Sequence, residues 1–447
     1  MKRIWIKHLL FSMLMLMMLL PFVQHYFGFP KVKGLKGYFV VPKKPVFSYH
    51  NLMNSTYQDS LNKYLEQHIG YRPDLVRLHN QYKYTFFDTV TAAGVIEGKN
   101  GYLFELNYFK AYYGLDFVGM DTIQKHINQT ITVNEWLQKN KKHLLVVLAP
   151  GKASFFPEYI TDGYKPDSVL PTNETTYYKL LKENNIPVIS GNRLFNSIKD
   201  TSRFALYPKC GIHWSYYGMG VVFDTIINTM EQISGRDFVD FGIKNIEVTH
   251  RLRSPDRDLW EGLNLFSQPN DDPMPYPEFT FEKKRPDSMP SVIVVADSYY
   301  WQWYGSGYAS RAFGKHDFWY YNKQIIPGDG GEAIQKHAID LMTRVLEADF
   351  IILLQTDANM PRYSFGFIPE LFNAIQKISQ WDATALSEIQ QTMDRIRKSP
   401  SYMEMIKEKA EKRKITVEEM LRIDATWVYE NKREAALKSQ EATKKTP

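Results

Sequence analysis

The 447-residue chain has little cysteine and little excess charge, and both shortages exclude classes of protein. A single cysteine, Cys210, can form neither an internal disulfide framework nor a cysteine-based zinc site. The net charge is only +6, and no run of Lys and Arg is dense enough to indicate nucleic-acid binding. What the chain has is a 44% hydrophobic and 15% aromatic composition, enough for at least one large core.

Apolar residues form one long run, at the N-terminus. Lys2, Arg3 and Lys7 precede the stretch from Leu9 to Val23, in which only Ser12 is polar. A spanning helix needs roughly 20 apolar residues, a length reached from residue 4 if Lys7 extends its amine to the interface. We expect residues 1–27 to be a retained signal anchor. A cleaved signal peptide is the alternative, although the bulky residues 24–27 offer no small-residue cleavage site. The basic flank places the N-terminus in the cytoplasm and the chain after residue 28 outside it.

Beyond the anchor, helical patterns alternate with short apolar runs. We expect strands at 144–148, 187–190, 292–295 and 350–354, and helices near 120–139, 175–184, 213–234 and 332–346. Asn100-Gly101 predicts a hairpin turn within 95–104. Such alternation indicates an α/β fold with a doubly wound, mostly parallel sheet, which binds ligands at the carboxyl ends of its strands. We expect a linker with entry helices over 28–95, the main domain over 96–380 and a charged helical tail over 381–447.

Ser298 stands at one of these strand ends. The apolar run 292–295 is followed by Ala296, Asp297 and Ser298. Catalytic serines often occupy such a position, because the turn exposes the hydroxyl and the following amides can face an oxyanion. The alternative is a serine that merely caps the next helix.

His213 is the candidate partner of this serine. It lies just before Ser215, which is a good N-cap for the helix that follows. A serine and a histidine form the minimum pair for acyl transfer, with the histidine as general base. The alternatives are a structural histidine bonded to the backbone beside Trp214, and a Cys210–His213 nucleophile pair.

These segments resemble, in the same order, motifs of the SGNH-hydrolase-like periplasmic proteins of the alginate O-acetyltransferase type. The resemblance covers most of residues 50–375. It rests on the Gly-Tyr-Arg break at 70–72, the Gly-Lys-Asn-Gly-Tyr-Leu-Phe hairpin at 98–104, and Ala-Pro-Gly-Lys at 149–152 with Phe-Pro-Glu at 156–158. It rests also on Gly-Ile-His-Trp-Ser at 211–215 and Ala-Asp-Ser-Tyr at 296–299. The order of histidine before serine is distinctive, since ordinary SGNH hydrolases carry the serine first.

The resemblance implies transfer of an acetyl or other acyl group to hydroxyls of an extracytoplasmic polysaccharide, through a Ser298–His213 acyl-enzyme. It implies a membrane-bound acyltransferase partner, a single-pass inner-membrane location with the soluble domain in the periplasm, and no metal or cofactor. A carbohydrate esterase is one alternative. A catalytically silent polysaccharide-binding or export assembly protein is another.

One position departs from the family pattern. Where the family has an aspartate two residues before the histidine, this chain has Gly211. Loss of such a carboxylate in a serine protease costs about 10⁴ in kcat. Three explanations are open. Asp297 or Asp357 supplies the carboxylate that orients the histidine, a Ser–His dyad suffices for catalysis, or the site is catalytically inactive.

Further residues complete the expected site. Asp297 either orients the histidine, as a third catalytic residue, or holds the turn. Lys152 either binds an anionic substrate group or lies solvated in a loop, and Asn359 is either an oxyanion donor or a turn residue. The aromatic rings near the serine suit stacking on sugar faces, although most belong to the core. The expected substrate contacts among them are Tyr299, Trp301 and Trp303.

Overall fold

The computed structural model describes residues 2–37, 41–168, 170–267, 272–283, 289–379 and 383–444, in two compact units. The first unit comprises Met1–Leu106, Lys209–Ile212 and Leu252–Asp272, and the second comprises Asn107–Pro208, His213–Arg251 and Pro273–Pro447. The chain therefore passes between them repeatedly. The domain boundaries expected from the sequence stay a prediction. The expected boundary at 380 lies outside the described residues.

The first unit begins with the apolar helix α1 (Lys2–Phe27). Its stretch Trp5–Phe27 has a mean hydropathy of 2.0 and is unburied, so it is long and apolar enough to cross a membrane. The predicted helical break at Gly70 is confirmed, with Pro73 in the first turn of the next helix. The predicted hairpin is also confirmed, because Asn100 and Gly101 both take positive φ. The unit also contains α2 (Tyr49–Met53), α3 (Thr56–His68), α4 (Arg72–Phe87), β1 (Val95–Glu97), β2 (Leu103–Glu105) and α11 (Asp258–Leu263).

A seven-stranded sheet forms the centre of the second unit, in the order β10-β9-β8-β7-β11-β3-β4. The five strands from β8 to β4 are mutually parallel. At one edge β9 is antiparallel to β8, and β10 is antiparallel to β9. The expectation of a mostly parallel sheet is thus confirmed. The strands are β3 (His143–Ala149), β4 (Val188–Ser190), β7 (Val292–Ala296), β8 (His316–Tyr320), β9 (Gln324–Pro327), β10 (Ile334–Gln335) and β11 (Phe350–Thr356).

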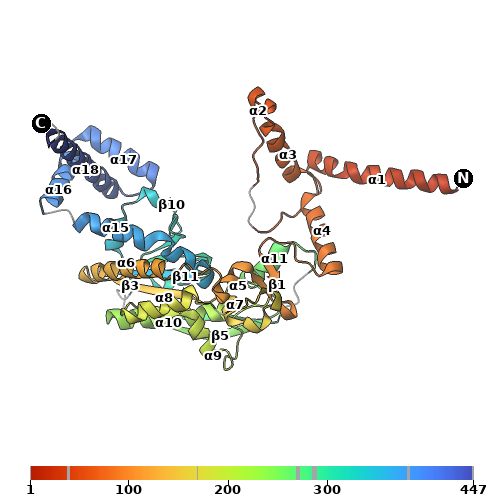
Figure 1. The fold of residues 1–447 in the computed structure, drawn as a ribbon, viewed down its shortest axis with the longest axis horizontal. Coiled ribbons are helices and arrows are strands. Elements are labelled where there is room, and N and C mark those ends of the chain that lie inside the picture. The colour runs from red at the N-terminus through yellow and green to blue at the C-terminus, as the bar shows by residue number, and fades with distance from the viewer. Residues whose placement is uncertain are drawn as a thin grey trace. The chain divides into compact units, whose positions relative to one another are not determined.

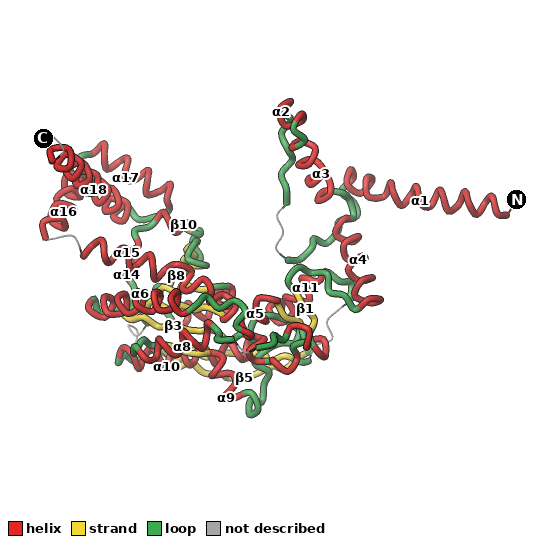
Figure 2. The backbone as a smooth tube through the Cα atoms, viewed as in Figure 1, coloured by secondary structure: helices red, strands yellow, loops and turns green. Residues whose placement is uncertain are grey.

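Helices cover both faces of this sheet, as in a doubly wound fold (Figures 1 and 2). Alternate residues of β3, β7 and β11, such as Val146, Val295 and Leu353, form one core with the helices of one face. Those helices are α6 (Met120–Lys139), α8 (Asn173–Glu183), α14 (Leu341–Glu347) and α15 (Phe367–Ser379). Helices α9 (Gly191–Ile198) and α10 (Tyr216–Ser234) contact β3 from the other side.

Other helices complete the second unit. They are α5 (Leu106–Tyr113), which begins at the last residue of the first unit, α7 (Lys152–Phe155), α12 (Trp301–Gly305), α13 (Tyr308–Ala312), α16 (Ala383–Arg397), α17 (Pro400–Arg413) and α18 (Val417–Lys444).

Two parts of the second unit differ from the sequence prediction. The helix expected over 332–346 is wrong in its first half, because Ile334 and Gln335 pair with β9 and α14 begins only at Leu341. The long antiparallel pair β5 (Val239–Thr249) and β6 (Met274–Lys283) was not predicted. Its two strands are far apart in sequence, so no short turn signals the pairing.

The C-terminal helices α16, α17 and α18 have a small core of their own, which includes Met393, Ile406 and Leu421. A buried ion-pair network ties them to the sheet domain. Arg344 of α14 lies 3.2 Å from the carboxylate of Glu419 and 3.7 Å from that of Asp317 on β8. Glu419 is 3% exposed, so removal of either partner would leave a buried charge uncompensated.

Candidate active site

The chemical groups predicted from the sequence gather at the carboxyl edge of the sheet. Parallel register pairs Ala296 of β7 with Leu354 of β11, and Thr356 of β11 with Ala149 of β3. The segments after these three strands therefore start side by side. They carry Ser298, Asp357 and Lys152.

Asp297 organises the turn after β7. One carboxylate oxygen accepts a hydrogen bond from the Tyr299 amide at 3.1 Å, which makes Asp297, and not Ser298, the cap of the short helix that follows. The other oxygen accepts three bonds of 2.9 Å, from the Thr356 amide, the Thr356 hydroxyl and the Asn359 amide group. A fully buried carboxylate with four donors is well satisfied. This geometry supports the turn-holding role of Asp297.

Ser298 and His213 meet at the end of this turn. His213 Nε2 lies 3.0 Å from Ser298 Oγ, and both residues are half-buried. The histidine is positioned by the start of α10, where Ser215 caps the helix by accepting the Gly218 amide and itself donates to the Ala205 carbonyl. Trp214 is buried against Trp303, which anchors the backbone next to the imidazole. The 3.0 Å separation is a distance suited to proton transfer.

Tyr321, which the sequence reasoning missed, also lies at the serine. It follows β8, whose Tyr320 pairs with Ala296, and its amide donates to the Ala296 carbonyl at 2.9 Å. Burial, with the negative charge of Asp297, raises the pKa of Tyr321 to about 12, and hydrogen bonding with the Ser298 hydroxyl opposes that rise. Its φ of 50° is rare for an aromatic residue, and such strain clusters at functional sites. No sequence signal marks it, because β8 lacks a continuous apolar run.

A group of buried tyrosines lies beneath the histidine. Tyr299 is 1% exposed, its ring centroid is 4.8 Å from that of His213, and its hydroxyl lies 3.3 Å from that of Tyr207. Tyr207 in turn donates to the Pro150 carbonyl at 2.5 Å. Burial raises the pKa of both phenols well above its usual value. The expectation that Tyr299 contacts substrate is therefore wrong, and the residue supports the histidine from within the core.

The two tryptophans that were expected to contact substrate differ in their exposure. Trp303 is 2% exposed and stacks on Trp214, so the expectation that it faces a glycan is wrong. Trp301 is 38% exposed and is bordered by the rings of Tyr304, Phe318 and Tyr320. The role of Trp301 as a stacking surface for a sugar stays a prediction.

Asn359 is half-buried and Lys152 is fully buried at the carboxyl edge of the sheet. The Asn359 amide group donates to Asp297 and to the Thr356 hydroxyl, which supports the turn role over the oxyanion role. Lys152 begins α7 and is fully buried, so the alternative of a solvated loop lysine is wrong. Anion binding by Lys152 stays a prediction. Cys210 is also buried, at 1% exposure.

The position of Gly211 is explained by packing in the first unit. A Cβ atom at residue 211 would lie 2.5 Å from the Pro255 carbonyl oxygen and 2.8 Å from the Asp256 carbonyl group. Only glycine fits against this backbone. Neither of the two carboxylates expected as substitutes hydrogen-bonds to His213 in the described structure: Asp297 holds the turn, and Asp357 accepts from the Ser154 hydroxyl and the Ala358 amide.

Asp357 has the environment of a carboxyl that titrates near neutral pH. It is 3% exposed, and burial raises its pKa to about 7. The hydrogen bonds from Ser154 at 2.8 Å and from Ala358 at 2.7 Å oppose the rise. Gly151 permits this burial, because a Cβ there would lie 1.9 Å from the carboxylate.

This raised pKa predicts a pH-dependent stability. The folded state keeps the Asp357 proton up to about pH 7, whereas the unfolded state loses it near pH 4, so the free energy of unfolding falls as pH rises between these values. Between pH 5 and pH 8 the fall is about 3 kcal/mol. Asp357→Asn should remove most of it, as measured by urea unfolding across this range. Ser154→Ala should raise the pKa of Asp357, so that the free energy of unfolding continues to fall to a higher pH. An unchanged dependence of the free energy of unfolding on pH in both variants would contradict the prediction.

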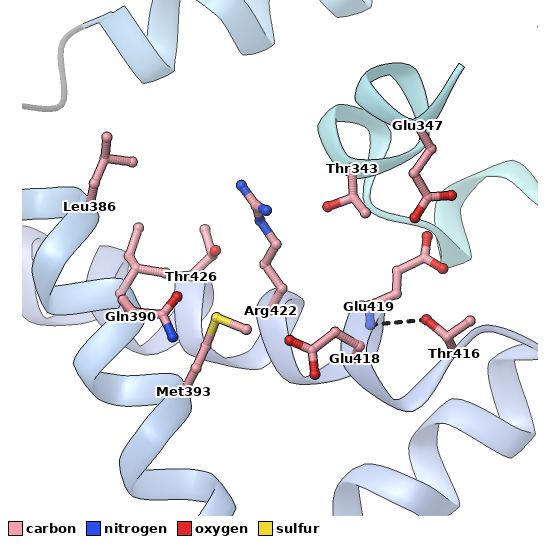
Figure 3. A pocket seen from close by; sticks show the side chains of 11 residues that line it. Thr343, Glu347, Leu386, Gln390, Met393, Thr416, Glu418, Glu419, Arg422 and Thr426 are labelled. Atoms are coloured by element: carbon pink, nitrogen blue, oxygen red, sulfur yellow. Dashed lines mark hydrogen bonds between the residues drawn. The ribbon is translucent and has the colours of Figure 1, made fainter. Parts of the chain in front are cut away.

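A separate pocket of about 350 Å³ lies between α14 and the C-terminal helices (Figure 3). Arg422 extends into it, 3.4 Å from the Asp340 carboxylate, and the Glu419 amide donates to the Thr416 hydroxyl at its floor. The Arg422–Asp340 contact joins the tail to the sheet domain, and the pocket includes neither Ser298 nor His213.

No protein-family model matches the chain, and no curated protein matches it. Solved structures similar to it do exist. The O-acetyltransferase domain of AlgJ from Pseudomonas putida is 14% identical, with a TM-score of 0.39 over 63% of this chain and 99% of that one. PatB1 from Bacillus cereus is 10% identical, with a TM-score of 0.40 over 61% of this chain and 99% of that one. AlgX from Pseudomonas aeruginosa is 11% identical, with a TM-score of 0.40 over 62% of this chain and 67% of that one.

Proposed function

We propose that the protein transfers an acyl group, acetyl in the simplest case, to hydroxyls of an extracytoplasmic polysaccharide through an acyl-enzyme on Ser298. The observation that carries the proposal is the 3.0 Å approach of His213 Nε2 to Ser298 Oγ at the carboxyl edge of the sheet. The motif resemblance supplies the acceptor class.

The chemistry requires the neutral histidine tautomer with its proton on Nδ1. His213 Nε2 takes the proton of Ser298 as Oγ attacks the acyl carbonyl carbon, and then returns that proton to the leaving group. A sugar hydroxyl attacks the resulting ester while Nε2 takes the hydroxyl proton. Ser298 leaves and is reprotonated, which completes the transfer without a net change in the enzyme.

Tyr321 is the proposed hydroxyl donor to the developing oxyanion. The amides that were expected to serve are engaged elsewhere, since the Tyr299 amide donates to the Asp297 carboxylate and the Tyr300 amide to the Asp297 carbonyl at 3.4 Å. The Tyr321 amide donates to the Ala296 carbonyl at the end of β7, two residues before Ser298, and with a pKa of about 12 the phenol stays protonated at neutral pH and can act as a donor. Enzymes use tyrosine hydroxyls in this way.

Helix α1 and the motif resemblance together support the proposed setting of the reaction. The length and apolar character of α1 support its role as a membrane anchor. The motif resemblance supports a periplasmic location and a membrane-bound acyltransferase partner that delivers the acyl group. Trp301, the exposed ring near the serine, offers a flat apolar surface to a sugar acceptor.

A trapping experiment tests this function. The protein is incubated with a chromogenic acetyl ester, and the Ser298 peptide is examined by mass spectrometry for one added acetyl group. The acetylated enzyme is then mixed with acidic and neutral polysaccharides. Ester gained by a polysaccharide supports transfer, and loss of the acetyl group to water alone supports the esterase alternative. No adduct and no turnover from folded protein would favour the silent polysaccharide-binding alternative.

Replacement of Tyr321 by phenylalanine separates the role of its hydroxyl as an oxyanion donor from the packing of its ring. The variant keeps the ring packing against Phe365 and should lower kcat/KM for the acetyl ester about 10²-fold, because one oxyanion donor is lost. Tyr320→Phe is the matched control, since Tyr320 lies next to it on β8 and should lose less than about twofold. Equal turnover in the two variants would remove Tyr321 from the mechanism.

A further inference from the structure

Helix α4 carries its apolar residues on the outside. Leu75, Leu78, Tyr82 and Phe86 recur at helical spacing along one side, and their exposed fractions are 48%, 59%, 51% and 72%. Phe87, at 56%, extends the same surface. Contiguous exposed apolar surface of this kind marks an interaction site. We call these five residues the α4 apolar row.

The polar side of the same helix faces the protein and is hydrogen-bonded there. Arg77 is 7% exposed and donates to the Gly34 carbonyl at 2.6 Å. Asn80 donates to the Leu263 carbonyl at 2.8 Å, and the Gln81 side-chain oxygen accepts the amides of Phe266 and Ser267 at 3.0 and 3.1 Å. These bonds fix the rotation of α4, so the apolar row cannot turn inward without breaking them.

The start of α4 is held at the end of the anchor helix. The Tyr71 amide donates to the Gln24 side chain at 3.1 Å. A Cβ at Gly70 would lie 1.9 Å from the Pro21 carbonyl oxygen, so the turn before α4 packs directly on the last turns of α1. The apolar row thus begins where the membrane-crossing segment ends.

We propose that α4 lies in the lipid–water interface and buries its apolar row among the lipids. The inference rests on the proposed anchoring of α1 and extends it. Two features favour lipid over a protein partner. The row ends in Tyr82, Phe86 and Phe87, and aromatic residues are enriched at membrane interfaces. Residues 28–88 contain nine Lys and Arg against four Asp and Glu, a charge that suits anionic headgroups.

Site-directed fluorescence on the full chain tests this placement. Cys210→Ala removes the only cysteine, and single cysteines are introduced at Leu78, at Leu14 of α1 and at Lys179 of α8. Each is labelled with an environment-sensitive fluorophore, and the protein is reconstituted in phosphatidylethanolamine–phosphatidylglycerol vesicles. A lipid-borne quencher and aqueous iodide then report where each label lies.

The expected result is that the lipid-borne quencher reduces the Leu78 signal at least about twofold more than the Lys179 signal. Iodide should quench Lys179 and spare Leu78. Quenching of Leu78 by iodide, or by neither agent because protein covers it, would overturn the inference. The label at position 14 distinguishes the membrane anchoring of α1 from the interfacial placement of α4. If the lipid-borne quencher reduces its signal but not that of the label at position 78, the anchor is supported and the α4 inference fails. An iodide-quenched Leu14 would remove the anchor itself, and no outcome depends on acyl transfer.

Discussion

Replacement of Ser298 by alanine is expected to lower kcat/KM for a chromogenic acetyl ester by about 10⁴-fold or more. The physical reason is that the hydroxyl at 3.0 Å from His213 Nε2 provides both the attacking oxygen and the proton that the imidazole removes. His213→Ala should cause a loss of similar size. The double variant should be no worse than either single one, because the two groups act as a unit.

Ser306→Ala is the matched control for this series. Ser306 follows α12, and its hydroxyl donates to the Gln302 carbonyl at 2.5 Å, so its loss should leave turnover within about twofold. Circular dichroism of each variant establishes that the fold is retained. Turnover that survives in folded Ser298→Ala would locate the nucleophile elsewhere and remove the proposed acyl-enzyme.

Replacement of Gly211 by aspartate is expected to disrupt folding and not to improve catalysis. The substitution restores the carboxylate of the family pattern, but its Cβ would lie 2.5 Å from the Pro255 carbonyl oxygen and 2.8 Å from that of Asp256. These neighbours are backbone atoms, which cannot move aside as a flexible side chain does. We expect the free energy of unfolding to fall by about 3 kcal/mol or more, as overpacking against rigid structure predicts.

Gly211→Ala and Gly262→Ala separate sterics from charge. Alanine at 211 introduces the same Cβ without the carboxylate and should destabilise the protein in the same direction. Gly262, in α11 of the same unit, has nothing within 4 Å of its Cβ position, so Gly262→Ala should be neutral or slightly stabilising. Thermal unfolding of the three variants measures this. A stable Gly211→Asp protein with turnover at or above that of the parent would contradict this prediction.

Four strands and the two principal residues of the candidate site could be predicted from the sequence. Strands β3, β7 and β11 are buried on both faces and so appear as continuous apolar runs, and β4 was placed by its position after a helix. Because the ends of parallel strands meet at one edge, Ser298 was placed at a ligand-binding position. The chain order and the motifs supplied His213.

Strand β8 and Tyr321 could not be predicted, because β8 includes His316 and Asp317 and breaks the apolar pattern. Its register beside β7, which places Tyr320 opposite Ala296, is a property of the folded sheet. The two tryptophans show the same limit. Trp301 and Trp303 are two residues apart in a short helix, yet one is 38% exposed and the other 2%.

The sequence by itself determined the fold class, the apolar N-terminal helix, the strand end that carries Ser298 and the pairing candidate His213, because these depend on local pattern and chain order. The tertiary structure decided which groups surround the serine, why residue 211 is glycine, and which apolar residues of α4 stay outside. Each of those depends on the approach of segments that are distant in sequence, such as the Pro255 carbonyl beside Gly211 and the Leu263 carbonyl beside Asn80.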